Sequence, residues 1–193
     1  HVIPGHPIAG TEKSGPDAGF ASLFENRWFI ITPEPGGSAE YVAATDNLAA
    51  FWSMLGSKVE RMDAARHDLV LAVTSHIPHL IAYNMVATAY DMEAVPEGEV
   101  VKFSAAGFRD FTRIAASDPT MWRDVFLNNK EAVLEVLGRF EEDLTALRKA
   151  IRNAEGQKLF DTFTESRRIR REIIDAGQDT SAANFGRDTS KKP

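Results

Sequence analysis

The sequence contains no cysteine, no long apolar run and no surplus of positive charge. Without cysteine among its 193 residues, the chain forms no disulfide, no thiolate nucleophile and no cysteine-ligated metal centre. No apolar run approaches the roughly 20 residues that span a bilayer, and no basic-then-apolar signal opens the chain. A formal charge of -6 argues against a surface that follows nucleic-acid phosphates. We therefore expect a cytoplasmic protein that binds neither membrane nor nucleic acid.

Two motifs of common catalytic and cofactor sites are also missing. The sequence has no Gly-x-Ser-x-Gly, the nucleophile turn of many serine hydrolases. It has no Gly-x-Gly-x-x-Gly, which binds dinucleotide phosphates at a strand-to-helix turn. What is present is an ordinary globular composition, with 44% hydrophobic and 26% charged residues. The length is enough for one domain or one and a half.

The first third of the chain has the pattern of a strand–helix–strand unit. Residues 26–32 are apolar and β-branched and precede a turn rich in proline and glycine, which predicts a buried strand. Ser38 begins a predicted helix that ends near Leu55, and residues 57–62 form a second predicted strand. One such unit makes a poor sheet, so we expect partner strands upstream of residue 1, as though the chain were cut from a longer one.

After Asp63 the sequence predicts helices only. Pro78 should kink the first of them, because a proline inside a helix removes a hydrogen bond. The predicted helices cover residues 64–92, 107–117, 121–128, 130–153 and 159–174. From residue 177 the side chains are small, polar and mixed in charge, which predicts a disordered tail.

The segment GFRDFTRIAASDPTMW at 107–122 contains a candidate carboxylate receptor. On one helix, Asp110, Arg113 and Ser117 would share a face, because neighbours three and four apart are separated by roughly 60° and 40°. Ser117-Asp118-Pro119 should end that helix and cap the next one. A rigid arginine beside a helix break suits a carboxylate. The alternative is that Arg113 only pairs with Asp110 on a solvated surface.

Histidines supply the other candidate groups. His6 is fixed by Pro7 on a predicted loop, where it would meet a ligand or simply face solvent. His76 and His79 lie close to the predicted kink, and although they could ligate a metal, spacing places no acidic third ligand. His67 is not joined to them by spacing. Neutral histidine suits a general base near pH 7, and arginine with protonated histidine suits carboxylates.

Three motifs together resemble those of the prephenate and arogenate dehydrogenases of tyrosine biosynthesis. They are HPIAGTE at 6–12, SHIPH at 75–79 and the whole segment at 107–122, in the order found in that family. With the helical pattern, the resemblance covers about residues 1–175. The missing glycine motif is the main departure from the family.

The resemblance implies a mainly α fold in three parts. Residues 1–62 would be the last strand–helix–strand unit of a Rossmann-type nucleotide-binding domain. Residues 63–176 would be an all-helical domain that binds substrate and forms an intertwined homodimer, and residues 177–193 the tail.

The resemblance also implies a reaction, the oxidative decarboxylation of prephenate or arogenate with NAD or NADP. His6 matches the catalytic histidine, which takes the proton of the 4-hydroxyl group. Arg113 matches the arginine that binds the ring carboxylate, and His79 a substrate-binding histidine. The other implied residues would line or gate the pocket (Thr11, Glu12, Ser75, His76) or support it (Asp110, Ser117, Trp122). The preferred substrate and cofactor, and inhibition by tyrosine, stay open.

Two other interpretations compete with this one. The chain could be a non-catalytic helical module for dimerisation and regulation that holds an aromatic amino acid, which the missing glycine motif favours and the intact His6 segment disfavours. It could also belong to another branch of the hydroxyacid dehydrogenases, against which the SHIPH and FTR segments argue.

Overall fold

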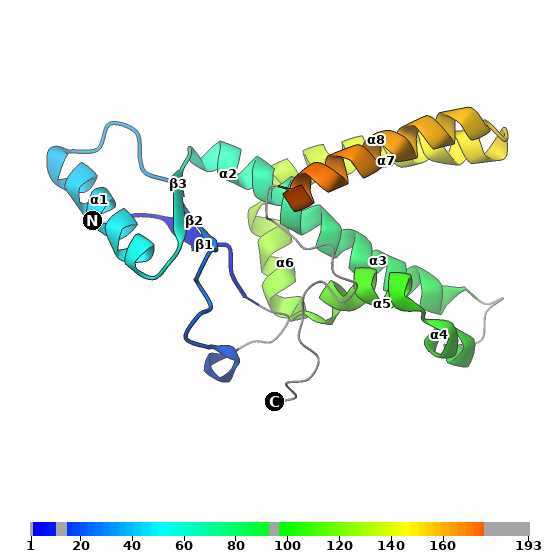
Figure 1. Ribbon diagram of the computed structural model, residues 1–193, viewed down its shortest axis with the longest axis horizontal. Coiled ribbons are helices and arrows are strands. Elements are labelled where there is room, and N and C mark those ends of the chain that lie inside the picture. Colours follow the sequence, from blue (N-terminus) through cyan, green and yellow to red (C-terminus); the bar gives the residue numbers. More distant parts are fainter. Residues whose placement is uncertain (1, 11–14, 93–96, 176–193) are drawn as a thin grey trace. The chain divides into compact units, whose positions relative to one another are not determined.

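The computed structural model describes residues 2–10, 15–92 and 97–175 (Figure 1). Its strands are β1 (Gly5–Pro7), β2 (Trp28–Ile31) and β3 (Lys58–Arg61). Its α-helices are α1 (Ala39–Met54), α2 (Ala64–Leu71), α3 (Ile77–Asp91), α4 (Glu97–Phe103), α5 (Ala106–Thr112), α6 (Pro119–Asn128), α7 (Lys130–Arg152) and α8 (Gly156–Asp175). Single turns of other helix types cover Pro16–Ala18, Ala72–His76 and Arg113–Ala116. The prediction of a mainly helical fold with an α/β beginning is confirmed.

The described strands form one small sheet in the order β1-β2-β3. β2 pairs in parallel with β3 through the crossover helix α1, as the strand–helix–strand pattern predicts. β1 pairs antiparallel with β2, and His6 lies opposite Ile30. The prediction that His6 lies on a loop is therefore wrong. Pro7 fits this strand because its neighbour Ile8 donates to the Trp28 carbonyl, so the Pro7 nitrogen faces away from β2.

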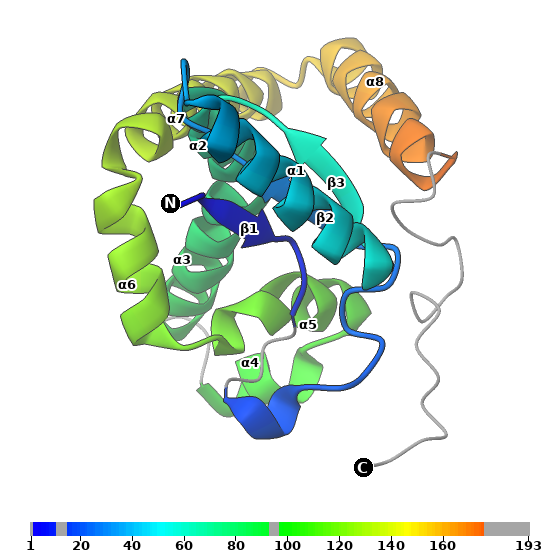
Figure 2. The ribbon, with the colours of Figure 1, turned by 90° about the vertical axis from the view of Figure 1, so that its left-hand side faces the viewer.

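Helix α1 lies against the sheet (Figure 2). Its first turn is capped by Ser38, whose hydroxyl accepts the Tyr41 amide, as predicted. Trp52 from its last turns stacks on Phe29 of β2, with ring centroids 4.0 Å apart. This apolar contact fixes the sheet against α1 and so holds the β1 end of the sheet, where His6 lies.

Pro78 lies within a continuous helical stretch that runs from α2 to α3. A π-helical turn at Ala72–His76 precedes it, in which the Ile77 amide donates to the Ala72 carbonyl, five residues back. The extra residue in this turn places Pro78 at the start of α3, where a missing amide hydrogen is tolerated. The sequence predicts a proline kink here, and the structure shows a π turn that also carries Ser75 and His76.

The stretch from α2 to α3 is also long and apolar. An 18-residue window within these 28 residues has a mean hydropathy of 1.3, enough by length and composition to cross a bilayer, contrary to the prediction from sequence that no run is long enough. Ala72 and Ile77 from this stretch nevertheless form a core with Val133 of α7. His67 and His76 of this stretch make polar contacts with other segments, described below.

The segment after α5 differs from the prediction. α5 ends at Thr112, Arg113–Ala116 is a 3-10 turn, and Ser117 has extended backbone angles. Ser117 therefore does not share a helix face with Arg113, because the chain leaves the helix before reaching it. Asp118 caps α6 by accepting the Thr120 and Met121 amides, as predicted.

The structure divides into two compact units within α7, between Gly138 and Arg139. In the second unit, α7 and α8 are joined by a turn in which Ala154 has a φ of 53° and the Glu155 amide donates to the buried Ala150. The boundary expected at residues 62 and 63 stays a prediction. The expected disordered tail lies outside the described residues.

Candidate active site

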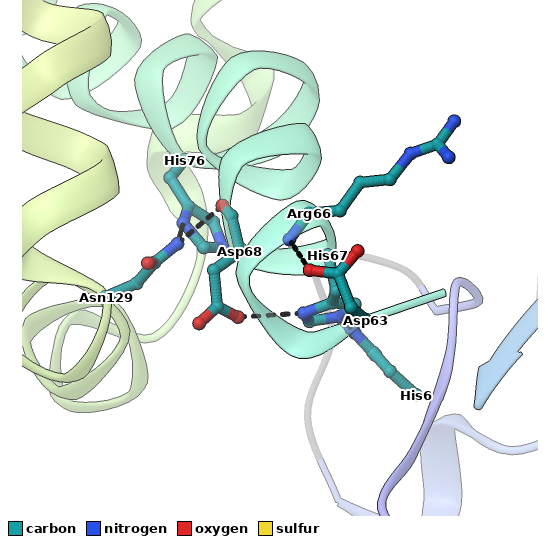
Figure 3. Close-up of polar contacts among 7 residues, drawn as sticks. All are labelled: His6, Asp63, Arg66, His67, Asp68, His76 and Asn129. Atoms are coloured by element: carbon teal, nitrogen blue, oxygen red, sulfur yellow. Dashed lines mark hydrogen bonds and ion pairs between the residues drawn. The ribbon is translucent and has the colours of Figure 1, made fainter. Parts of the chain in front are cut away.

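Three side chains form a line of ring and carboxylate contacts between β1 and α2 (Figure 3). Nδ1 of His6 lies 3.0 Å from Nε2 of His67. Nδ1 of His67 lies 2.9 Å from Oδ1 of Asp68. The two rings meet edge to face, with centroids 5.2 Å apart. His6 on β1 therefore contacts α2, at the start of the helical part of the chain, although His67 lies 61 residues later in the sequence.

Asn129, between α6 and α7, holds His76 in the π turn. Its amide nitrogen donates to the Asp68 carbonyl at 2.9 Å, and the same nitrogen lies 3.1 Å from Nδ1 of His76. Because a carbonyl only accepts, the first bond fixes which way the amide points. Nδ1 of His76 is then the acceptor, so Nε2 of the neutral ring carries the hydrogen and can donate to a ligand.

His79 is fixed one turn further along. Its Nδ1 lies 2.8 Å from the Ser75 carbonyl, so Nδ1 carries the hydrogen and Nε2 is the acceptor of the neutral ring. Its ring stacks on Trp122 of α6, with centroids 3.7 Å apart and planes 22° apart. The Trp122 indole N–H is buried and has no acceptor among the residues that the structure describes. A buried donor of this kind suits a ligand oxygen.

The surroundings lower the pKa of three of these histidines. Partial burial lowers the pKa of His6, and His67 lowers it further. Burial is also the largest cause for His76, followed by the nearby rings of His6, His67 and His79. For His79, burial outweighs the opposing bond to Ser75, and the charge of Arg113 lowers the pKa further. These three rings are therefore neutral near pH 7. The prediction from sequence paired arginine with a protonated histidine instead.

Electrostatic effects link four of the expected site residues: His6 and His79 each lower the pKa of His76, and Arg113 lowers the pKa of His79. Ser75 joins them through its carbonyl. Thr11 and Glu12 lie outside the described residues.

The structure shows partners for two of the expected supporting residues. Asp110 lies 3.7 Å from Arg109, and the Ser117 carbonyl accepts the Tyr83 hydroxyl. Trp122 packs on His79, and its support of Arg113 stays a prediction.

Sequence reasoning missed His67, Asp68 and Asn129. No local signal marks them, since their partners lie on other elements. Among the described residues, no group of three or more His, Asp or Glu side chains could hold a metal ion.

Models of two domains of one protein family match most of the chain. Residues 1–61 match the nucleotide-binding domain of prephenate dehydrogenase. Residues 63–165 match the dimerization domain of prephenate dehydrogenase. The chain belongs to the prephenate dehydrogenase family. The resemblance drawn from the three motifs is confirmed.

Individual relatives in this family cover most of the chain. A cyclohexadienyl dehydrogenase of Zymomonas mobilis is 43% identical over 88% of this chain and 57% of its own length. A prephenate dehydrogenase of Bacillus subtilis is 34% identical over 87% of this chain and 44% of its own length. The chain thus spans about half the length of these relatives.

Solved structures of the family share the fold. The prephenate dehydrogenase of Aquifex aeolicus in complex with hydroxyphenyl propionate and NAD+ superposes with a TM-score of 0.79 at 39% identity, over 89% of this chain and 58% of that chain. The arogenate dehydrogenase of Synechocystis gives 0.73 at 26% identity, over 89% of this chain and 61% of that chain.

Asn129→Ala is expected to lower the free energy of unfolding by about 1–3 kcal/mol, because the Asp68 carbonyl and His76 lose their donor. Urea denaturation at fixed protein concentration measures this loss. Asn128→Ala is the matched control, since that amide donates to the exposed Asp124 carbonyl one turn back. We expect the control to change stability by less than about 0.5 kcal/mol. Equal losses in both variants would contradict the bridging role of Asn129.

Stability is expected to fall as the pH drops from about 7.5 to about 5.5. The folded pKa values of His76 and His79 lie below their ordinary value of 6.5, so the unfolded chain binds more protons below that pH. Their stabilising effect is therefore complete above pH 6.5 and is lost as the pH falls toward the folded values. Urea midpoints across this range test the slope. His79→Gln should flatten it, and an unchanged slope would contradict the assignment.

Proposed function

We propose that this chain forms the substrate-binding part of an enzyme that oxidatively decarboxylates prephenate or arogenate in the cytoplasm. The observation that carries the proposal is the approach of His6 from β1 and of Arg113 from the turn after α5 to His76 and His79 of the α2–α3 stretch. Three neutral imidazoles beside one permanent cation suit an anionic substrate that must lose a hydroxyl proton. The activities named for the Zymomonas, Bacillus and Synechocystis relatives support the same conclusion.

His6 acts as the general base in this proposal. Its lowered pKa leaves the ring neutral near pH 7, ready to accept the proton of the 4-hydroxyl group. As that proton moves to His6, the ring carbon that bears the hydroxyl group loses hydride. The bond between the ring and its carboxylate, on another ring carbon, then breaks. Carbon dioxide leaves, and the bonding electron pair completes the aromatic ring. The phenolate then recovers the proton from His6, so the reaction consumes no net proton.

Arg113 and the two histidines of the π turn and α3 bind the substrate. We assign the ring carboxylate to Arg113, whose planar guanidinium can donate two parallel hydrogen bonds to a carboxylate. The Nε2–H of His76 and the buried Trp122 indole N–H are donors for further substrate oxygens. His79 presents an acceptor at Nε2, held in place by Ser75 and the Trp122 ring.

The redox cofactor is expected to be NAD, the nucleotide in the Aquifex structure. The chemistry that it would supply when bound is acceptance of the hydride. The sequence of this chain contains no Gly-x-Gly-x-x-Gly motif, so we assign no phosphate contact to its residues. Tyrosine has the aromatic ring of the product, and we propose that it competes for the same pocket.

The proposed function is tested by measuring turnover. The protein to be measured is this chain joined to a complete nucleotide-binding domain, which is called the completed enzyme below. We expect formation of reduced nicotinamide from prephenate or arogenate with NAD. Calorimetric titration of the 193-residue chain alone with tyrosine and 4-hydroxyphenylpyruvate measures the pocket separately. Tyrosine binding without any turnover of the completed enzyme would contradict the enzymatic role and favour a regulatory module.

We also propose that the chain forms a homodimer. Residues 63–165 match a dimerization domain, and most of the apolar stretch Ala64–Asp91 is exposed in a single chain. Residues Arg139–Asp175 expose further large apolar side chains: Leu144, Ile151, Phe160, Phe163, Ile169 and Ile173. Exposed apolar surfaces of this kind are usually buried against a partner, and we propose that a second copy of the chain buries them.

Sedimentation velocity at about 10 µM is expected to show twice the 21.3 kDa chain mass. Phe163→Asp should raise the dimer dissociation constant at least about tenfold, because it places a charge on the apolar face. Thr162→Asp adds the same charge at a neighbouring exposed position and should leave the dimer intact. A wild-type monomer at this concentration would refute the dimer.

A further inference from the structure

The contacts of His67 determine where hydrogens can lie along the line from Asp68 to His6 (Figure 3). An ionised carboxylate only accepts, so Oδ1 of Asp68, 2.9 Å away, requires the hydrogen on Nδ1 of His67. A neutral imidazole has one N–H, which leaves Nε2 of His67 as an acceptor. That nitrogen lies 3.0 Å from Nδ1 of His6, which must then carry the hydrogen.

We propose that Asp68 and His67 are positioning residues that fix His6 in its Nδ1–H tautomer and leave Nε2 as the basic nitrogen. Neither residue matched a motif in the sequence. Asp68 is itself anchored, because its backbone carbonyl accepts the Asn129 amide from the α6–α7 junction. The contacts from Asn129 through Asp68 and His67 therefore position the His6 side chain on β1 relative to the helices.

The consequence for catalysis rests on the proposed function, in which Nε2 of His6 takes the substrate proton. In the opposite tautomer Nε2 already carries a hydrogen and cannot act as a base. When His6 becomes an imidazolium, its Nδ1–H donates to His67, whose ring the Asp68 carboxylate holds. An aspartate that holds a catalytic histidine in the correct tautomer through its ring N–H is a known arrangement in hydrolases. Here a second imidazole stands between the carboxylate and the base.

Nitrogen-15 NMR of the histidine rings tests the proposal on the 193-residue chain without any catalytic assay. At neutral pH the wild-type His6 is expected to be the Nδ1–H tautomer. If His67 were instead protonated, it would donate to His6 and give the Nε2–H tautomer, which would overturn the proposal. This wild-type measurement decides the matter even if a variant fails to fold.

Asp68→Asn should raise the share of the Nε2–H tautomer of His6, since an amide can donate to His67 as well as accept from it. In the completed enzyme we expect kcat to fall about 3-fold to 30-fold, with KM for prephenate within about 2-fold. Asp63→Asn is the matched control. It removes the same charge from the same helix end, while asparagine keeps the cap that accepts the Arg66 amide. It should change neither the tautomer nor kcat.

The two arms separate the possible failures. An unchanged His6 tautomer in Asp68→Asn, or an altered tautomer with unchanged kcat, would overturn the positioning role. A wild-type completed enzyme that does not oxidise prephenate or arogenate would overturn the proposed function, and the tautomer shift in the chain alone would still support the role of Asp68 and His67.

Discussion

His6→Asn is expected to lower kcat of the completed enzyme for prephenate by about 10²–10⁴, the usual range for loss of a general base. Asparagine keeps a donor near the position of Nδ1, so the contact to His67 can persist. It removes Nε2, the nitrogen that we propose takes the hydroxyl proton. Because substrate carboxylates are assigned to other residues, KM should stay nearly unchanged.

Steady-state kinetics across pH distinguishes this role from a structural one. The wild-type rate should fall at acidic pH as His6 becomes protonated, at a pH below the ordinary 6.5 because its folded pKa is lowered. The variant should lose this acidic limb. A loss that appears only in KM, or a variant that keeps the acidic limb, would remove His6 from the role of base.

Arg113→Ala should weaken the binding of prephenate by about 1.5–3 kcal/mol, or about 10-fold to 150-fold in Kd, through loss of one charge-assisted contact. Calorimetry on the 193-residue chain measures Kd directly, since no hydride acceptor is added. Ligands without a ring carboxylate provide an internal comparison. Tyrosine and 4-hydroxyphenylpyruvate should lose much less affinity if Arg113 binds that carboxylate.

Arg109→Ala is the matched control for this measurement. Arg109 lies one turn before Arg113, pairs with Asp110, and its side chain is 71% exposed. Its removal should leave the Kd for prephenate unchanged. Arg113→Lys should fall between wild type and alanine, because lysine keeps the charge but not the planar fork. Equal losses for all ligands in Arg113→Ala would make Arg113 a structural residue.

The sequence by itself determined the elements whose causes are local. The Ser38 cap, the apolar strand at 26–32 and the Asp118 cap before Pro119 each depend on a few neighbouring residues, and the structure confirms each. The three motifs also identified the family, since each is a short run of residues with a fixed order.

Local patterns failed where two rules of similar strength competed. Helical periodicity carried Arg113 and Ser117 onto one face, but the chain leaves the helix after a 3-10 turn as it approaches Pro119. Pro78 predicted a kink, and what the sequence did not predict is the π-helical turn at Ala72–His76 just before it. Because this turn lies between His67 and His79, the ideal α-helical angle between these two residues does not apply.

Only the tertiary structure decided which side chains form the site. His6 and His67 are 61 residues apart, and Asn129 joins Asp68 and His76 from the other end of the helical part. Such contacts arise from packing of the sheet and helices, which no short-range pattern encodes. The same packing buries His76, partly buries His79 and brings His67 against His6, so the neutral state of these rings also depends on the fold. The sequence thus determined which chemical groups are available, and the fold determined their partners and their protonation, because both depend on distances between segments remote in sequence.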